Sequence, residues 1–159
     1  MKKIIVLMTS LLLLTGCVKV SFTGPKKEEK TSQSSNRKKE PLTFVRAEQY
    51  KDQDNEVLEA SEKFIKEHPT LGEAGKLFVF FPGYTFGNEE SRFALFFIVN
   101  RTTTTIDRDG SFVLNLEYDR EPLFKDVTFD YEINESGVLK PNTAAAIPIK
   151  ITKEQEEKM

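Results

Sequence analysis

Runs of apolar residues, separated by turn-forming residues, fill the second half of the chain. Two of these runs alternate between apolar and polar positions, over residues 112–118 and 127–133. Because successive side chains of a strand point to opposite faces of a sheet, this alternation predicts strands with one buried face. The turn signals between runs include Pro82-Gly83 and Ser136-Gly137. We therefore predict strands over residues 77–81, 92–100, 112–118, 123–133 and 144–152.

One run, residues 93–99, is apolar at every position. A strand that is apolar on both faces is expected at the centre of a sheet, where both faces are covered. Ten of the 13 phenylalanines lie between Phe78 and Phe129, which places the core in this part of the chain. Short strands with turns about every 8–12 residues favour a mainly β fold, a small immunoglobulin-like β-sandwich.

Residues 55–67 show a helical period instead. Apolar side chains recur along one helical face, at Val57, Leu58, Ala60, Phe64 and Ile65. Asn55 or Asp54 is suited to cap the start, since a short polar side chain accepts the free N–H groups of the first turn. Pro69 is expected to end the helix at His68, because proline disfavours α geometry in the residue before it. The sandwich is thus preceded by one short α-helix.

The first residues have the pattern of a secretion signal. Lys2 and Lys3 form a positive region, and an apolar stretch follows over residues 4–14. As a helix this stretch would be about 16 Å long, well short of the ~30 Å hydrocarbon core of a bilayer. The pattern therefore predicts a signal peptide and not a stable membrane span.

The apolar stretch ends in Leu14-Thr15-Gly16-Cys17, which resembles the lipobox of bacterial lipoprotein precursors. The resemblance covers residues 1–17. It implies transfer of a diacylglyceryl group to the thiol of Cys17 and cleavage between Gly16 and Cys17. The alternative is an ordinary signal peptide followed by an incidental buried cysteine. Cys17 is the only cysteine in the chain, so an internal disulfide is excluded.

A polar, charged segment follows the cysteine. Residues 25–41 contain no large apolar side chain and are rich in Lys, Glu and Ser. Such a composition cannot bury enough surface to offset the entropy of ordering, so residues 17–41 are expected to form a lipidated, disordered, basic tether. The basic charge either draws the tether toward an anionic leaflet or simply keeps it soluble. Residues 18–22 alternate like a strand, and the sequence leaves their place in the fold open.

The charge of the chain is divided between its parts. Residues 42–159 hold 14 basic and 22 acidic residues, a net charge of −8, whereas the whole chain has a net charge of only −2. The near-zero net charge of the whole chain argues against a nucleic-acid binder, which would normally have a strongly basic domain. We divide the chain into the signal peptide 1–16, the tether 17–41, an N-terminal extension 42–76 and the β-sandwich 77–159 with a short charged tail.

A second resemblance is less specific. Residues 96–102 (FFIVNRT), followed later by Leu139-Lys140-Pro141-Asn142, look like immunoglobulin-like modules found in extracytoplasmic lipoproteins of low-GC Gram-positive bacteria. In those modules a hydrophobic strand ends in Asn and a small polar residue, and a Leu-x-Pro turn leads into the last strand. This resemblance covers about residues 77–152 and implies a fold, but no functional residue.

Tyr84 and Phe86 are the candidate binding residues. They lie in a Pro-Gly-Tyr-Thr-Phe-Gly segment, residues 82–87, whose Pro and Gly residues can hold aromatic side chains on a rigid loop. Tyrosine and other aromatic anchors dominate many protein interfaces, so one interpretation is a ligand platform. The other is a bulge or hairpin corner whose aromatic side chains enter the core.

The remaining candidates for chemistry favour structural explanations. His68 is the only histidine and lies at the predicted helix terminus, where histidine commonly caps or is exposed. Residues 107–110 (Asp-Arg-Asp-Gly) resemble part of a calcium loop, but Asp109-Gly110 between two strands favours a hairpin turn. Glu89 and Glu90 could serve a glycosidase only if another carboxylate faced them. We predict no catalytic residue, no metal site and no cofactor.

Taken together, these features favour a membrane-anchored extracytoplasmic lipoprotein. Its partners would be the membrane, through the diacylglyceryl group on Cys17, and an unknown protein or envelope component. The folded part would be a non-catalytic binding or adaptor module. Two alternatives are a carboxylate-dependent envelope enzyme that acts on glycans and a small solute-binding receptor, although about 118 residues is short for a two-lobed receptor.

Overall fold

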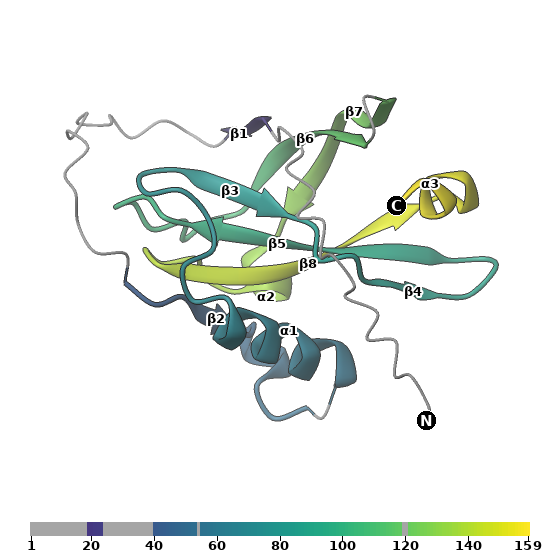
Figure 1. Ribbon diagram of the computed structural model, residues 1–159. Helices are drawn as coiled ribbons and strands as arrows, with labels where there is room; N and C mark the ends of the chain where they lie inside the picture. The colour runs from purple at the N-terminus through teal and green to yellow at the C-terminus, as the bar shows by residue number, and fades with distance from the viewer. Residues whose placement is uncertain (1–18, 24–39, 54, 119–120) are drawn as a thin grey trace, which may run out of the picture.

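The computed structural model describes residues 19–23, 40–53, 55–118 and 121–159, and for residues 19–23, 118 and 121 only the backbone (Figure 1). The described residues form a small mixed domain that consists mostly of strands. In chain order the elements are β1 (Lys19–Thr23), β2 (Thr43–Val45), the 3-10 helix η1 (Glu48–Tyr50), α1 (Glu56–Glu67), β3 (Leu77–Phe80), β4 (Thr85–Gly87), β5 (Arg92–Asn100), β6 (Gly110–Tyr118), β7 (Glu121–Tyr131), α2 (Ile133–Ser136), β8 (Thr143–Ile151) and α3 (Lys153–Lys158).

A five-stranded sheet is built around β5. Its order is β2-β8-β5-β3, and β4 pairs with the other half of β5 on the same side as β3. β8 runs antiparallel to β5 over nine residue pairs, while β2 joins β8 in parallel. Residues 94–100 of β5 are buried, which confirms the prediction of a central strand covered on both faces.

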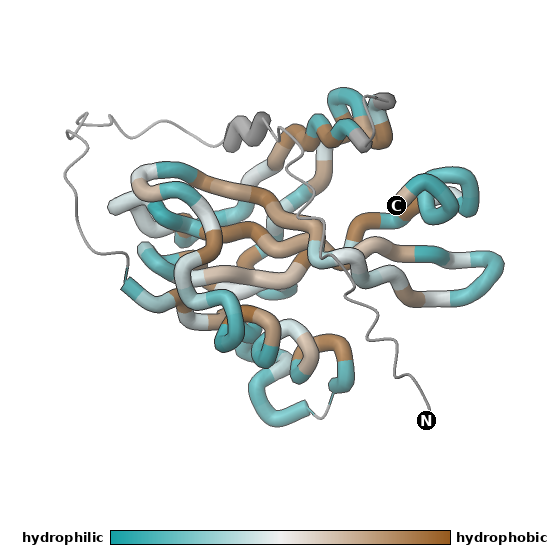
Figure 2. The backbone as a smooth tube through the Cα atoms, in the orientation of Figure 1, coloured by the Kyte–Doolittle hydropathy of each residue, from teal (hydrophilic) through white to brown (hydrophobic). Residues whose placement is uncertain are grey.

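A second sheet, of three strands in the order β1-β6-β7, lies on one side of the first (Figure 1). Apolar side chains of both sheets share one hydrophobic cluster. Phe96 and Ile98 come from β5, Phe112 and Leu114 from β6, and Tyr131 from β7. Figure 2 shows hydrophobic residues along the central strands and hydrophilic residues at the tip of the β4–β5 hairpin.

Helix α1 covers the opposite face of the five-stranded sheet (Figure 1). The side chain of Asn55 accepts the N–H groups of Val57 and Leu58, so Asn55 is the N-cap, and the predicted helix over 55–67 is confirmed. The ring of Phe64 stacks on that of Phe97, with centroids 5.2 Å apart. Alternate residues of β5 therefore enter two clusters, one between the sheets and one under α1.

The prediction of a domain that consists mostly of strands is confirmed at that level, but the helix does not precede every strand, because β1 and β2 come before α1 in the chain. The structure does not define an immunoglobulin-like sandwich, because the two sheets do not close, β2 joins β8 in parallel, and α1 covers one face of a sheet. The domain is therefore described more coarsely, as a small mixed fold with two packed sheets.

One predicted turn is wrong. Asp109-Gly110 does not connect the two strands of a hairpin, because β5 and β6 belong to different sheets. The side chain of Asp109 instead accepts the N–H of Ile133 at 2.9 Å, at the start of α2. The predicted strand 123–133 also ends early, at Tyr131, because Ile133 begins this short helix.

Candidate binding site

The hairpin formed by β4 and β5 presents the candidate residues. Its turn is fixed by Asn88, whose side chain accepts the N–H groups of Glu90 and Ser91. Gly87 has φ +113°, and a Cβ there would lie 2.0 Å from the carbonyl oxygen of Ser91, so this position requires glycine. Paired residues share a face, and Phe86 is opposite Phe93 in the register of β4 and β5.

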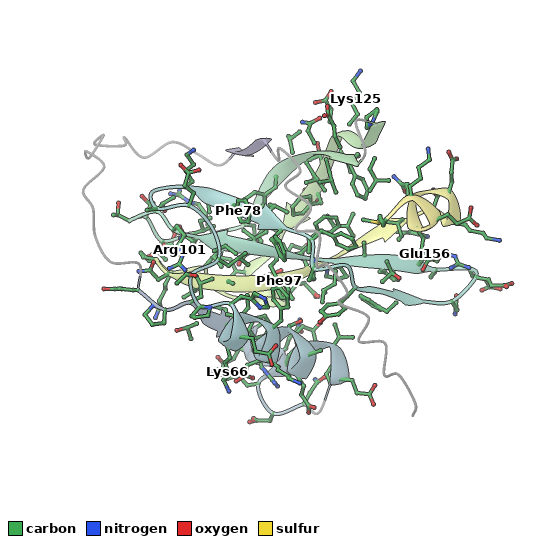
Figure 3. All side chains as sticks on the ribbon, viewed as in Figure 1. Lys66, Phe78, Phe97, Arg101, Lys125 and Glu156 are labelled. Atoms are coloured by element: carbon green, nitrogen blue, oxygen red, sulfur yellow. The ribbon has the colours of Figure 1, made fainter. Side chains whose placement is uncertain are left out.

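The two faces of this hairpin have different chemistry. On the face toward the three-stranded sheet, the hydroxyl of Thr85 donates to Glu156 of α3 at 3.0 Å, and Arg92 forms an ion pair with the same carboxylate. Figure 3 shows Glu156 on α3 above the hairpin. On the other face the rings of Phe86 and Phe93 stack, with centroids 5.6 Å apart. The polar contacts hold the hairpin in place and direct Phe86 to the α1 side of the sheet.

Tyr84 and Phe86 remain at the surface. They are the exposed large hydrophobic residues among the described side chains, with 46% and 37% of their surface accessible. The ring of Tyr84 contacts Phe64 of α1 edge-on, with centroids 6.3 Å apart. Neither side chain enters the core, so the interpretation as a buried corner is wrong. A binding role stays a prediction.

A cavity of about 270 Å³ adjoins this surface, and we call it the α1 groove. Its apolar lining comes from five elements: Phe44 of β2, Val57 and Leu58 of α1, Phe86 of β4, Leu95 of β5 and Pro148 of β8. Phe86 thus lines the α1 groove, whereas Tyr84 lies outside its lining.

Polar groups at the α1 groove come from short elements that the sequence did not reveal. The hydroxyl of Tyr50, in η1, donates to the carboxylate of Glu135, in α2, at 3.1 Å. Burial, and then the hydrogen bond and charge of Glu135, raise the pKa of Tyr50. Arg46 also lines the groove and forms an ion pair with Glu62 at 3.1 Å. Tyr50 and Glu135 are 85 positions apart, so no local pattern could have joined them.

A wider hollow of about 770 Å³ shares the lining residues Val45 and Arg46 with the α1 groove. Its charged lining residues are Arg46, Glu48 and Lys140. Among the residues that line the two cavities, Glu48 and Glu135 are the carboxylates, one in each. A glycosidase mechanism needs two carboxyl groups in one cleft, so neither cavity supplies an argument for it.

The other candidates have structural surroundings. Nδ1 of His68 lies 2.8 Å from the carbonyl oxygen of Phe64, and its ring stacks on that of Phe64, so His68 closes the C-terminal end of α1. Glu89 and Glu90 lie exposed at the tip of the β4–β5 hairpin. In the described part of the chain, no group of three or more His, Cys, Asp or Glu side chains is arranged to hold a metal ion.

Arg101 is a buried cation with only 6% of its surface accessible. Its guanidinium donates to the carbonyl oxygens of Leu71, Pro69 and Glu40 and to the side-chain oxygen of Asn142. These four acceptors are neutral, and burial lowers the pKa of Arg101. Figure 3 shows Arg101 at the end of the sheet away from the β4–β5 hairpin. The arginine therefore ties the start of the domain to the end of β5.

The two sequence segments behind the second resemblance meet at this point. The side-chain amide of Asn100 donates to the carbonyl oxygens of Thr104 and Leu139, at 2.8 and 2.9 Å. The N–H of Asn142 donates to the carbonyl oxygen of Asn100 at 2.7 Å. The side-chain oxygen of Asn100 accepts the N–H of Thr102. Both segments thus have a structural role in joining the end of β5 to the start of β8.

Gly16 and Cys17, the predicted cleavage and lipidation residues, lie outside the described residues. Within the part of the chain that the structure describes, the helices are too short or too polar to cross a bilayer. Comparison of the chain with protein-family models, with curated proteins and with solved structures found no match.

Proposed function

We propose that the protein is a membrane-anchored extracytoplasmic lipoprotein whose folded domain is a non-catalytic binding or adaptor module of the cell envelope. The lipobox-like Leu14-Thr15-Gly16-Cys17 after an apolar stretch supports the anchor. A diacyl group on Cys17 would hold durably, since each buried CH₂ contributes about 0.8 kcal/mol. The proposal keeps the resemblance in fold to the immunoglobulin-like modules of such lipoproteins, and the core shared between the two sheets supports it.

The observation that carries the binding role is the exposure of Tyr84 and Phe86 beside an apolar groove. Burial of aromatic side chains against a partner releases more free energy than burial of most other residues, and such residues form interface hot spots. The domain has a net charge of −8 over residues 42–159, which favours a partner with basic residues around an apolar contact. The proposed ligand is an apolar, basic segment of an envelope protein.

The anchor is tested by metabolic labelling with a clickable fatty acid. The parent protein is expected to incorporate the label and to fractionate with membranes. Cys17→Ala removes the acceptor thiol and is expected to lose both properties, while Cys17→Ser tests whether an oxygen can replace sulfur. Equal labelling of the parent and Cys17→Ala would refute the anchor.

The binding surface is tested in intact cells by photo-crosslinking. A photoreactive phenylalanine analogue replaces Phe86, and the matched control places it at Thr128, which is exposed on β7 of the other sheet. A discrete adduct is expected at position 86 only, and Tyr84→Ala should weaken it by about 30-fold or more if Tyr84 is a hot spot. The same adducts at both positions, or none at 86, would contradict the proposed surface.

A further inference from the structure

Strand β1 lies next to the predicted anchor in the sequence and belongs to the folded domain. It pairs with β6 in antiparallel register, from Lys19 opposite Asn115 to Thr23 opposite Ser111. Only Val18 separates Cys17 from β1. Because a residue of extended chain spans at most about 3.6 Å, the Cα atoms of Cys17 and Lys19 are no more than about 7 Å apart.

We propose that β1 holds the lipidated end of the chain directly on the domain, so that the end of the three-stranded sheet near Asn115 rests against the bilayer. The inference rests on the lipidation of Cys17 proposed above. In this arrangement only Val18, and not a long tether, separates the lipidated cysteine from the folded domain. The interaction surface is this end of the sheet, and its partner is the lipid bilayer that carries the acyl chains.

The segment between β1 and β2 supports this arrangement. Residues 24–39 connect Thr23, the last residue of β1, to Glu40. The carbonyl oxygen of Glu40 accepts a hydrogen bond from Arg101, and its carboxylate accepts one from Asn142 at 2.9 Å. Both ends of this basic segment therefore belong to the folded domain. Its length does not set the distance between anchor and domain.

The register also identifies the end of the sheet that faces the membrane. The antiparallel pairing brings Lys19 to Asn115, toward the C-terminal end of β6. The side chain of Asn115 accepts the N–H of Asp126 at 2.9 Å, at an irregular point of the β6–β7 pairing. Lys125 is exposed beside this point and projects away from the body of the domain (Figure 3).

Attachment of the domain through β1 also determines which way the α1 groove faces. β1 and the three-stranded sheet lie on one side of the five-stranded sheet, and α1 lies on the other (Figure 1). A domain attached through β1 keeps the α1 groove away from the point of attachment. The candidate binding residues Tyr84 and Phe86 then remain accessible to a partner outside the membrane.

The pairing of β1 is tested in the full-length lipidated protein with engineered cysteine pairs. Acylation of Cys17, the only native cysteine, leaves the engineered thiols free to react with each other. Ser21→Cys with Val113→Cys joins registered partners and is expected to oxidise at least tenfold faster than Ser21→Cys with Glu117→Cys. The control site lies four residues further along β6, about 13 Å away, beyond the reach of a disulfide. Equal oxidation rates would overturn the proposal.

The position of the domain is tested by energy transfer on vesicles of phosphatidylcholine and phosphatidylglycerol. A donor dye on Lys125→Cys and acceptor dyes on the headgroups report the height of the sheet end. About a dozen Gly/Ser residues, with a mean reach of about 20 Å, are inserted either before Lys19 or after Lys30. Transfer is expected to fall with the first insertion only.

The outcomes separate the two proposals. An equal fall with both insertions means that residues 17–41 act as one tether, and it overturns the docking of β1. If fatty-acid labelling shows no lipid on Cys17, the proposed function and the membrane contact both fail. If Cys17 is labelled and the registered cysteine pair does not form, the anchor stands and the docking of β1 alone is refuted.

Discussion

At the scale of single residues, buried polar groups with complete hydrogen bonding decide the local structure. Arg101 and Tyr131 are the main examples, because each holds a segment that no regular element secures. Arg101 binds the chain at Glu40 and Pro69, whereas the hydroxyl of Tyr131 donates to the carbonyl oxygen of Gly137 at 2.7 Å. Loss of one partner leaves the other buried without a hydrogen bond, which costs more than the bond itself contributes.

Arg101→Lys is expected to destabilise the domain by roughly 2–4 kcal/mol. A lysine carries three donors on a single nitrogen, and so it cannot reproduce the planar fork that reaches four oxygens. Urea unfolding measures the change. Arg108→Lys is the matched control, because Arg108 is exposed and its replacement should stay within about 0.5 kcal/mol. Similar losses in the two variants would contradict the role given to Arg101.

Tyr131→Phe is expected to cost about 1–2 kcal/mol at neutral pH. Burial raises the pKa of Tyr131, so the folded state retains the phenolic proton after the unfolded chain begins to lose it near pH 10. The stability that Tyr131 contributes is therefore complete below about pH 10 and falls as the pH rises further. In urea unfolding, the difference in stability between parent and variant should be constant below about pH 10 and should narrow as the pH rises from about 10 to about 11. A difference in stability between parent and variant that stays constant across this pH range would contradict the role given to the Tyr131 hydroxyl.

At the scale of elements, short segments that gain their stability from long-range contacts complete the fold. β2 has three residues and pairs with β8, and α2 has four and contacts η1 and β8. A Cβ on Gly137, the C-cap of α2, would lie 2.6 Å from a methyl group of Val45 in β2. The close approach of these two elements therefore depends on one glycine.

Gly137→Ala is expected to destabilise the domain by about 1–3 kcal/mol more than Gly83→Ala. Both glycines have positive φ, +85° and +87°, and Gly137 combines it with ψ 172°, a backbone region that essentially only glycine adopts. Only Gly137 meets a neighbour, since no atom lies within 4 Å of a Cβ at Gly83. The difference in melting temperature between the two variants measures the combined cost of this steric contact and of the backbone conformation at Gly137. Equal melting temperatures would show that α2 can move away from β2.

Long elements with a clear period were predictable from the sequence. The apolar run of β5 and the capped period of α1 gave the correct type and nearly the correct bounds. β2 and β4 are too short to show a period, and β1 has a strand pattern but a partner that only the tertiary fold supplies. Helix α3 had a readable signal, because Thr152 and Gln155 form a capping box where a charged tail was expected.

The candidate site was also predictable only in part, because contacts with distant segments of the chain complete it. Tyr84 and Phe86 could be selected as aromatic residues between Pro and Gly. Their exposure depends on the contacts of Thr85 and Arg92 with Glu156, a residue of the C-terminal helix. The α1 groove depends on where α1 stops over the sheet. Sequence patterns report which residues suit a surface, but not which distant segments come to lie beside it.

At the scale of the whole molecule, the first and the last strand of the described chain belong to different sheets. β1 completes the three-stranded sheet, and β8 lies between β2 and β5 in the other. The acidic charge of residues 42–159 surrounds a core that the two sheets share. β1 therefore contributes to the stability of the domain as well as to its proposed attachment.

Deletion of residues 19–23 is expected to increase hydrogen exchange in β6, because the edge that β1 occupies becomes open to water. The amides of β5 serve as the internal control, since β5 is enclosed by β3, β4 and β8 and should keep its protection. Mass spectrometry of proteolytic fragments resolves the two strands. Unchanged exchange in β6 would mean that β1 adds nothing to the sheet.

The central place of β8 has a consequence for the order of folding. β8 is the last strand of the chain, yet it pairs with β2 a hundred positions earlier, Thr43 with Thr143, and with the whole of β5. A chain that emerges from a ribosome or a translocase with its N-terminus first must expose the apolar β5 until residues 143–151 appear. Contacts of such long range form slowly and leave hydrophobic segments open to aggregation. The domain therefore folds only after nearly all of it has been delivered.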